Sequence, residues 1–191
     1  MNIFFYGGTF DPPHIGHKMI VEYLLPLCDK LILIPAKKSP FKKKSPIANG
    51  IERIDMLKLL FDNPKIEVDD FEIRSKKENY TYLTVEYLMK KYKHCTFTMV
   101  IGRDQLNFLD RWKFIDTFFH NIKILCFNRN GFKHETKNSL YASSNIEYIN
   151  DFNFDVSSTE IRQSIESLNS NLENMLDLKV LEYIKKNNTY A

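Results

Sequence analysis

The sequence predicts an α/β protein built on a doubly wound parallel sheet with helices on both faces. Two observations carry this prediction. Through the first two thirds of the 191 residues, short β-rich runs alternate with segments of helical apolar spacing, which is the rhythm of βαβ units. The runs at 95–102 and 122–127 are almost continuously apolar, as strands of a sheet covered on both faces are.

The expected elements follow one another along the chain in this rhythm. Strands are expected at 2–6, 30–36, 65–73, 95–102 and 122–127, with 145–150 as a further candidate. Helices are expected at 15–27, 49–61, 81–92, 157–165 and 178–187, and the polar stretch 167–176 is expected to be a loop or a weak helix. Right-handed crossovers then bring the carboxyl ends of the strands, where ligands bind, to one edge of the sheet.

Two capping patterns support the predicted helix starts. Asn49 is followed three residues later by Glu52, and Ser157 is followed at the same spacing by Glu160. In such a pair each side chain accepts a backbone N–H of the other residue, which satisfies donors that the first turn leaves unpaired.

The composition is that of a globular protein and excludes several other classes. Hydrophobic residues make up 43% of the chain and charged residues 27%, which suits neither a disordered nor a membrane-spanning protein. A net charge of +3 is too small to indicate polyanion binding. No run approaches the roughly 18 apolar residues of a membrane span. We expect one domain over 1–191, in which 156–191 form a C-terminal helical part.

The cysteines indicate a reducing compartment. Cys28, Cys95 and Cys126 are odd in number, far apart and without the spacing of metal ligands, so buried free thiols are expected. The N-terminus starts a strand at once instead of a secretory signal. We therefore expect a cytoplasmic protein, with a nuclear location left open.

The stretch FFYGGTFDPPHIGH, residues 4–17, places a glycine turn and two histidines in the first βα connection. Gly7 and Gly8 lack the Cβ that would keep backbone N–H groups away from a ligand. His14 and His17 are three residues apart at a helix start, so they share a face where unpaired N–H groups attract anions. The pattern is neither G-x-G-x-x-G nor a Walker loop. It predicts a phosphate site, and the alternative is a turn with two incidental histidines.

The segment GGTFDPPHIGH resembles the signature of the nucleotidyltransferases that carry H-x-G-H on a Rossmann-like fold. In this full form it is most similar to the nicotinate-nucleotide adenylyltransferase family. Three further segments resemble motifs of that family in the same order: NYTYLT at 79–84, VIGRDQLNFLDRW at 100–112 and VSSTEIR at 156–162. The resemblance implies transfer of AMP from ATP to nicotinate mononucleotide, which gives nicotinic acid adenine dinucleotide and pyrophosphate in NAD biosynthesis.

The resemblance also implies a role for each matching residue. It makes His14, His17 and Arg162 catalytic, through contacts with the ATP phosphates and the departing pyrophosphate. Nicotinate mononucleotide is expected at Tyr80, Thr81 and Trp112, with its carboxylate at a helix start and its pyridine ring on the indole. Binding of ATP and its phosphates is expected at Gly7, Gly8, Thr9, Phe10, Lys42, Gly102, Asp104, Ser157 and Ser158. The resemblance implies Mg²⁺ held mostly by ATP phosphates and water, so no dedicated protein ligands are expected.

One segment departs from the family pattern. Residues 39–42 read Ser-Pro-Phe-Lys where the family carries P-P-H-K or P-P-H-R, so Phe41 replaces the histidine and Lys42 keeps only the basic end. Five lysines in 37–44 read most simply as a solvated loop, with a localisation signal or nucleic-acid contact as the alternatives. We expect neither a nucleic acid nor a membrane as partner.

Other functions stay open at the level of sequence. An enzyme of the same type could take nicotinamide mononucleotide or phosphopantetheine, although Thr81 and Trp112 weigh against phosphopantetheine. A protein of another class would bind nucleotide without catalysis, and the intact His14, His17 and Arg162 weigh against that reading. The sequence leaves open the oligomeric state, including a homo-oligomer, the preference for acid over amide substrate, and regulation.

Overall fold

The computed structural model describes residues 1–38, 45–76, 78–106, 108–127, 145–150, 152, 156–167 and 170–190. Six parallel strands form one sheet in the order β3-β2-β1-β4-β5-β6. Their bounds are β1 (Asn2–Gly8), β2 (Lys30–Pro35), β3 (Ile66–Val68), β4 (Thr96–Gly102), β5 (Lys123–Phe127) and β6 (Ile146–Ile149). The strand order reverses between β1 and β4, so the carboxyl ends of these two strands flank the position where open α/β sheets bind ligands.

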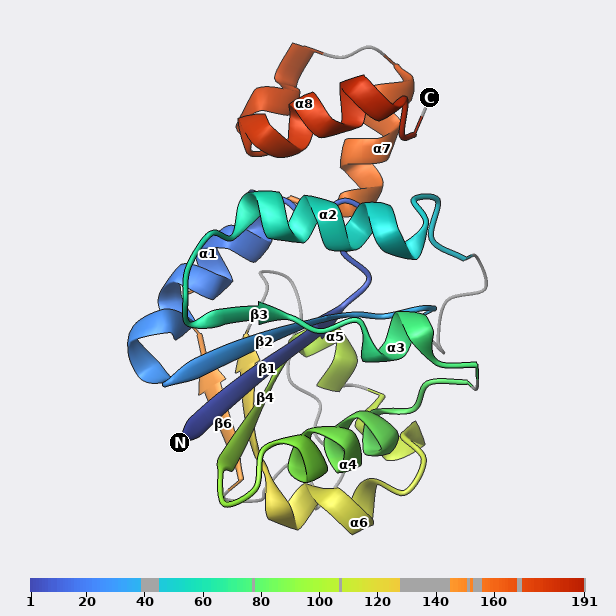
Figure 1. The fold of residues 1–191 in the computed structure, drawn as a ribbon. Helices are drawn as coiled ribbons and strands as arrows, with labels where there is room; N and C mark the ends of the chain where they lie inside the picture. Colours follow the sequence, from blue (N-terminus) through green and yellow to red (C-terminus); the bar gives the residue numbers. More distant parts are fainter. Residues whose placement is uncertain are drawn as a thin grey trace.

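Helices cover both faces of the sheet, as the sequence predicts. The longer helices are α1 (Ile15–Leu24), α2 (Gly50–Leu60), α4 (Thr81–Lys91), α7 (Ser158–Glu166) and α8 (Leu178–Asn187). The shorter ones are α3 (Phe71–Arg74), α5 (Arg103–Leu106) and α6 (Ile115–Phe118). Figure 1 shows α1 and α2 on one face and α4 and α6 on the other, so the sheet is Rossmann-like and doubly wound.

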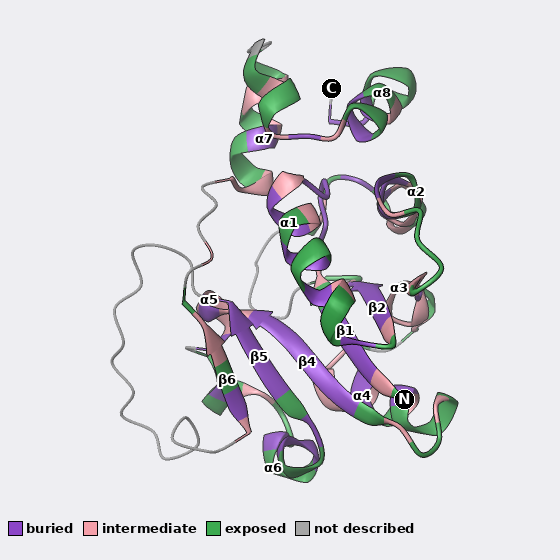
Figure 2. Cartoon of the chain, turned by 90° about the vertical axis from the view of Figure 1, so that its left-hand side faces the viewer, coloured by how far each residue is buried: buried purple, intermediate pink, exposed green. Residues whose placement is uncertain are grey.

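Alternating side chains of β1 supply the two apolar layers of the core. Ile3 and Phe5 pack into the layer under α4 and α6, while Phe4 and Tyr6 pack into the layer under α1. The period of two follows from the pleat of a strand. Figure 2 shows β4 and β5 almost entirely buried, which explains their continuous apolar sequences.

A third apolar cluster joins the C-terminal helices to α2. It contains Met56 and Leu60 of α2, Ile161 of α7, and Val180 and Ile184 of α8. Figure 1 shows α7 and α8 beyond α2, away from the sheet. The C-terminal part therefore packs its apolar side chains against α2.

Most predicted elements are confirmed, including the candidate strand at 145–150, which contains β6. Both capping pairs form: Asn49 with Glu52, and Ser157 with Glu160. Residues 167–176 contain a 3₁₀ turn at Ser170–Asn174, and the helix expected at 15–27 continues beyond α1 as a second 3₁₀ turn at Leu25–Leu27.

The strand expected at 65–73 is wrong in its second half. β3 ends at Val68, and α3 begins three residues later at Phe71. The Asp69 N–H donates to the Leu33 carbonyl, and its Oδ1 accepts the Phe71 N–H, both at 2.9 Å. The Asp69 side chain thus turns the chain out of the strand, a role typical of Asp in turns.

The cysteines are free, as expected. Cys28 and Cys126 are buried, whereas Cys95 is partly exposed. Burial raises the pKa of the Cys126 thiol to about 12, so this thiol stays protonated and inert at neutral pH. In the part of the chain that the structure describes, every helix is too short or too polar to cross a membrane.

A charged cluster fastens the edge strand β3 to its neighbours. The Glu67 carboxylate accepts hydrogen bonds from Lys30 Nζ (2.7 Å), Lys91 Nζ (2.7 Å) and the Tyr92 hydroxyl (2.6 Å). Burial opposes ionisation of Glu67, but these donors outweigh it and lower its pKa from 4.5 to about 2. The cluster therefore links β2, β3 and the end of α4 through one carboxylate.

Glu67→Gln is expected to lower the free energy of unfolding by about 2 kcal/mol at neutral pH, after allowance for the partial exposure of the cluster. Because the pKa of Glu67 is lower in the folded than in the unfolded protein, its contribution is complete above about pH 4.5 and is lost as the pH falls toward about 2. Urea unfolding of wild type and variant should therefore give a difference that shrinks between about pH 7 and pH 3.

Glu86→Gln is the matched control, since Glu86 lies 4.0 Å from Lys90 on the exposed side of α4. A surface pair of this kind contributes about 0.5 kcal/mol or less. Two results would contradict the stabilising role of ionised Glu67: an equal loss of unfolding free energy in the two variants, or a loss in Glu67→Gln that does not depend on pH.

Candidate functional site

A cavity of about 630 Å³ lies at the carboxyl edge of the sheet, where β1 and β4 end. Small-molecule sites have volumes of roughly 300–1,000 Å³. The starts of α1, α4 and α7 also reach its wall. The cavity brings together most of the site residues expected from the sequence: Gly7, Gly8, Thr9, Phe10, His14, His17, Thr81, Gly102, Asp104, Trp112, Ser157, Ser158 and Arg162.

The two glycines at the end of β1 serve different purposes. A Cβ on Gly7 would meet no atom within 4 Å, so this side of the backbone is open. A Cβ on Gly8 would lie 2.9 Å from the ring of Phe10, which is buried and has a positive φ of 49°. Gly8 is thus required by the packing of Phe10, which is a different reason from the ligand approach expected from the sequence.

His14 and His17 stack at the start of α1. His14 is the N-cap residue with an extended backbone, and the centroids of the two imidazole rings are 3.7 Å apart. The His14 backbone N–H donates to His17 Nδ1 at 3.1 Å. Since Nδ1 accepts this bond, His17 is neutral and carries its proton on Nε2. The site therefore has an imidazole donor in a fixed tautomer beside a helix N-terminus.

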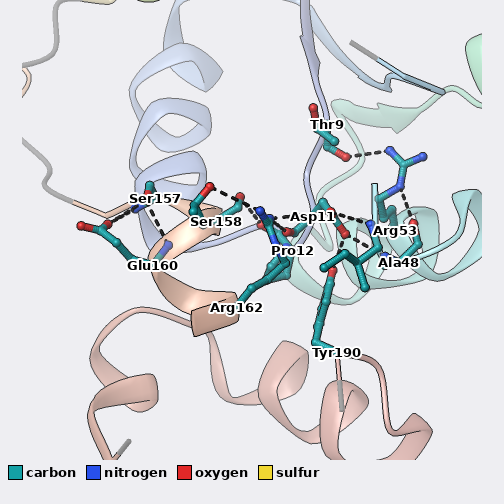
Figure 3. A network of polar contacts seen from close by, with 12 residues as sticks. Thr9, Asp11, Pro12, Ala48, Arg53, Ser157, Ser158, Glu160, Arg162 and Tyr190 are labelled. Atoms are coloured by element: carbon teal, nitrogen blue, oxygen red, sulfur yellow. Dashed lines mark hydrogen bonds and ion pairs between the residues drawn. The ribbon is translucent and has the colours of Figure 1, made fainter. Parts of the chain in front are cut away.

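Asp11 organises the polar side of the site (Figure 3), and the residue is only 4% exposed. Its Oδ1 accepts the Ala48 N–H and the Tyr190 hydroxyl, both at 2.9 Å. Its Oδ2 accepts the Ile47 N–H at 2.9 Å. Asp11 was not expected from the sequence to be a site residue, because an Asp before two prolines is typical of an ordinary turn.

Arg162 and Ser158 of α7 attach to the loop that contains Asp11. Arg162 Nη1 donates to the Asp11 carbonyl oxygen at 2.6 Å and lies 3.7 Å from Asp11 Oδ2. The Ser158 hydroxyl donates to the Pro12 carbonyl oxygen at 3.0 Å. Figure 3 shows both side chains pointing from the first turns of α7 toward this loop. The guanidinium is thus held at the wall of the cavity.

Ser157 is both the cap of α7 and part of the cavity wall. Its hydroxyl oxygen accepts the Glu160 N–H at 3.2 Å, and Glu160 Oε2 accepts the Ser157 N–H at 2.9 Å. The Ser157 hydroxyl also donates to Glu160 Oε2 at 2.8 Å. The capping interpretation of this segment is therefore correct, and Ser157 lines the cavity with its hydroxyl proton engaged by Glu160.

Arg53 of α2 is a buried cation that sequence reasoning missed. Its Nη1 donates to the carbonyl oxygens of Thr9 and Ala36, both at 2.7 Å, and its Nε donates to the Ala48 carbonyl at 3.2 Å. Burial lowers the pKa of Arg53, and the nearby Asp11 charge opposes that shift. An arginine within the apolar pattern of the helix at 49–61 was the available signal. Its guanidinium fixes the loop after β1 against α2.

The other end of the cavity is formed by the last residue of β4 and the residues that follow it. A Cβ on Gly102 would lie 2.5 Å from Asp104 Oδ1, so a side chain there would displace the Asp104 carboxylate. Asp104 Oδ2 accepts a hydrogen bond from Gln105 Nε2 at 3.2 Å. Trp112 also lines the cavity, and its buried Nε1 has no hydrogen-bond partner within the part of the chain described. This end therefore combines a carboxylate with an aromatic face.

Tyr80 and Thr81 lie at the start of α4, as expected, but their side chains differ in direction. Thr81 lines the main cavity. The Tyr80 hydroxyl instead contacts Glu78 and accepts a hydrogen bond from Lys113 Nζ at 2.7 Å, and its ring lines a neighbouring cavity. Tyr80 is the N-cap residue of α4, and its side chain forms no cap hydrogen bond. The start of α4 keeps backbone N–H donors for a ligand.

Glu72, Asn79 and Thr84 also line the cavity near α4 and were missed from the sequence. The Thr84 hydroxyl donates to Glu72 Oε1 at 2.8 Å, and Asn79 Nδ2 donates to the Glu72 carbonyl at 2.6 Å. Burial raises the pKa of Glu72, which the hydrogen bond from Thr84 opposes. Lys42 lies outside the described residues, and Lys38 and Ser45 on either side of that gap line the cavity.

The cavity thus has two chemically different ends. Near α1 and α7 it offers imidazole, guanidinium and hydroxyl donors with two helix N-termini, which suit phosphate groups. Near β4 and α4 it offers a carboxylate for hydroxyl groups, an indole and a free helix start. Such an arrangement can align two nucleotides with their phosphates side by side.

Comparison with known proteins agrees with this arrangement. The model of the cytidylyltransferase-like family matches residues 5–164. A probable nicotinate-nucleotide adenylyltransferase of Hydrogenobaculum sp. is 37% identical over 196 residues and covers 100% of this chain and 99% of its own. A probable nicotinate-nucleotide adenylyltransferase of Methylacidiphilum infernorum is 33% identical over 189 residues, which is 97% of this chain and 90% of its own.

Solved structures of low sequence identity share the fold. The nicotinic acid mononucleotide adenylyltransferase of Plasmodium falciparum complexed with NaAD superposes with a TM-score of 0.78 at 20% identity, over 99% of this chain and 97% of its own. From the sequence profile and the full-length relatives together, the chain belongs to the cytidylyltransferase-like family and, within it, to the nicotinate-nucleotide adenylyltransferases.

Proposed function

We propose that the protein transfers AMP from ATP to nicotinate mononucleotide and releases pyrophosphate, which forms nicotinic acid adenine dinucleotide. The observation that carries the proposal is that one cavity unites His14, His17 and Arg162 at one end with Thr81, Asp104 and Trp112 at the other. Full-length relatives named for this activity support it.

In the reaction, a phosphate oxygen of the mononucleotide forms a bond to the α-phosphorus of ATP while the bond between that phosphorus and the β-phosphate oxygen breaks. The electron pair leaves with pyrophosphate, so no covalent enzyme intermediate is needed. The residues act by position and charge: His17 Nε2–H donates to a phosphate oxygen, and Arg162 balances the charge that develops on the leaving group. The ring of His14 stacks on that of His17, and the His14 backbone N–H donates to His17 Nδ1, which fixes the His17 tautomer.

The preference for nicotinate over nicotinamide follows from the start of α4. Its N-terminal dipole and N–H donors, left without a side-chain cap by Tyr80, favour a carboxylate over a neutral amide. Asp104 would accept hydrogen bonds from the adenosine ribose, and the Trp112 indole would carry the pyridine ring.

Mg²⁺ is part of the same proposal as a companion of ATP. Within the described ranges, no three His, Cys, Asp or Glu side chains gather into a metal site, and Asp11 is committed to hydrogen bonds. Mg²⁺ prefers phosphate and water oxygens, and it would supply charge neutralisation on the triphosphate. We further propose one domain over 1–191 and a cytoplasmic location, which suits the free Cys28, Cys95 and Cys126.

Pyrophosphate release from Mg-ATP should be faster with nicotinate mononucleotide than with nicotinamide mononucleotide, because only the acid gains from the charge at the start of α4. His17→Ala should lower turnover by about 10²- to 10³-fold. His120→Ala is the control and should retain full turnover, because His120 is exposed in the 3₁₀ turn at Phe119–Asn121 and does not line the cavity. Equal use of the two mononucleotides would refute the carboxylate argument, and no release with either would refute the function.

Trp112 is the single tryptophan of the chain, so its fluorescence reports on the proposed pyridine site. Nicotinate mononucleotide should quench the emission saturably, because the electron-poor ring would stack on the indole. Trp112→Phe should raise the KM for the mononucleotide by about 3- to 10-fold, from the loss of aromatic contact, while the KM for ATP changes little. An unchanged emission during titration, or an effect on the ATP constant alone, would place the pyridine ring elsewhere.

A further inference from the structure

The last residues of the chain turn back from α8 toward the loop between β1 and α1 that contains Asp11, here called the catalytic loop. Asn188, the C-cap residue of α8, has a φ of 54°, and Tyr190 has a φ of 74°. Left-handed backbone at a bulky residue such as Tyr is unfavourable and persists where surrounding contacts impose it. Thr189 Oγ1 donates to Glu52 Oε1 of α2 at 3.2 Å, which holds the turn in place. The turn delivers the Tyr190 side chain into the protein.

The Tyr190 hydroxyl is hydrogen-bonded to the buried carboxylate of Asp11. It donates to Asp11 Oδ1 at 2.9 Å, and the tyrosine ring is buried in the apolar cluster that contains Ala48 and Ile161. Burial, with the Asp11 charge, raises the pKa of Tyr190 far above its ordinary value, so the hydroxyl remains a donor. Tyr190 does not line the main cavity, whereas Asp11 does. The hydrogen bond to Asp11 therefore joins Tyr190 directly to a residue of the cavity wall.

Asp11 and the substrate phosphates compete for the same cation. Arg162 Nη1 lies 3.7 Å from Asp11 Oδ2, too far for a hydrogen bond and near enough for a strong attraction. Arg53, the other nearby guanidinium, is already bound to the carbonyl oxygens of Thr9, Ala36 and Ala48. Arg162 is bound as well, from Nη1 to the Asp11 carbonyl oxygen (2.6 Å) and from Nη2 to Thr159 Oγ1 (3.3 Å). If Asp11 loses a donor, a short movement brings the same Nη1 from the carbonyl oxygen to Oδ2.

We propose that Tyr190 is a positioning residue: its hydroxyl satisfies Asp11 and so leaves Arg162 available to the phosphates of the bound nucleotide. This inference rests on the proposed function and extends it to the C-terminal end of the chain. Removing the hydroxyl leaves Oδ1 with the Ala48 N–H alone, and the carboxylate then draws the Arg162 guanidinium into a closer ion pair.

The test compares Tyr190→Phe with Tyr183→Phe in the pyrophosphate-release assay. Tyr183 is a matched control, because its hydroxyl joins α8 to Asp55 of α2 at 3.3 Å and neither residue lines the cavity. Tyr190→Phe should lower kcat by about 10-fold with both KM values nearly unchanged, since the guanidinium is displaced from the transition state. Tyr183→Phe should leave kcat unchanged. Thermal unfolding of both variants checks that each is folded.

A double-mutant cycle with Arg162→Lys separates positioning from a general structural effect. Lysine lacks the planar fork of arginine, so the variant is slower but keeps a cation in the cavity wall. In the Arg162→Lys background, Tyr190→Phe should lower kcat by less than about 2-fold, because the guanidinium that Tyr190 positions has been removed.

The outcomes are distinct. Absence of turnover in the wild type would refute the proposed function. Two results with normal wild-type turnover would refute the positioning role alone. One is an equal change in kcat for Tyr190→Phe and Tyr183→Phe. The other is a loss of kcat of about 10-fold from Tyr190→Phe in both the wild-type and the Arg162→Lys backgrounds.

Discussion

The buried carboxylate of Asp11 is the contact on which the site depends. An unpaired charge inside a protein is costly, and this one is balanced by two backbone N–H groups, the Tyr190 hydroxyl and the nearby Arg162. These partners come from the segment before α2, the C-terminal end and α7, which are far apart in the sequence. Figure 3 shows them converging on the loop between β1 and α1. The requirement to satisfy one charge therefore determines where the catalytic loop lies.

The fold supplies this loop with the right surroundings. Parallel strands end at a common edge, and the reversal of strand order between β1 and β4 leaves room for a ligand there. The starts of α1 and α7 face the same space and favour anions, while β4 and α4 provide the opposite wall. Because His17 Nδ1 is occupied by the His14 N–H, the imidazole is a donor in advance of substrate binding. Catalysis by position requires this kind of rigidity.

The sequence predicted the elements and residues whose signals are local. The apolar period revealed both layers of the core, and the motifs around His17, Asp104 and Ser158 led to side chains that meet in one cavity. It failed where the decisive partner is distant. The residues around Asp11 and Tyr190 do not indicate that either belongs to a site, because the hydrogen bond between the two spans 179 residues of sequence. Similarly, the strand at 65–73 was predicted too long, since the turn depends on hydrogen bonds of Asp69.

The central claim is that one cavity aligns the α-phosphorus of ATP with the mononucleotide phosphate. Its most direct test follows phosphorus label from ATP into the products of wild-type enzyme with nicotinate mononucleotide. The account predicts that label at the α-position enters the dinucleotide and label at the γ-position leaves in pyrophosphate. Transfer of the γ-label to the mononucleotide, or release of either label as inorganic phosphate alone, would contradict it.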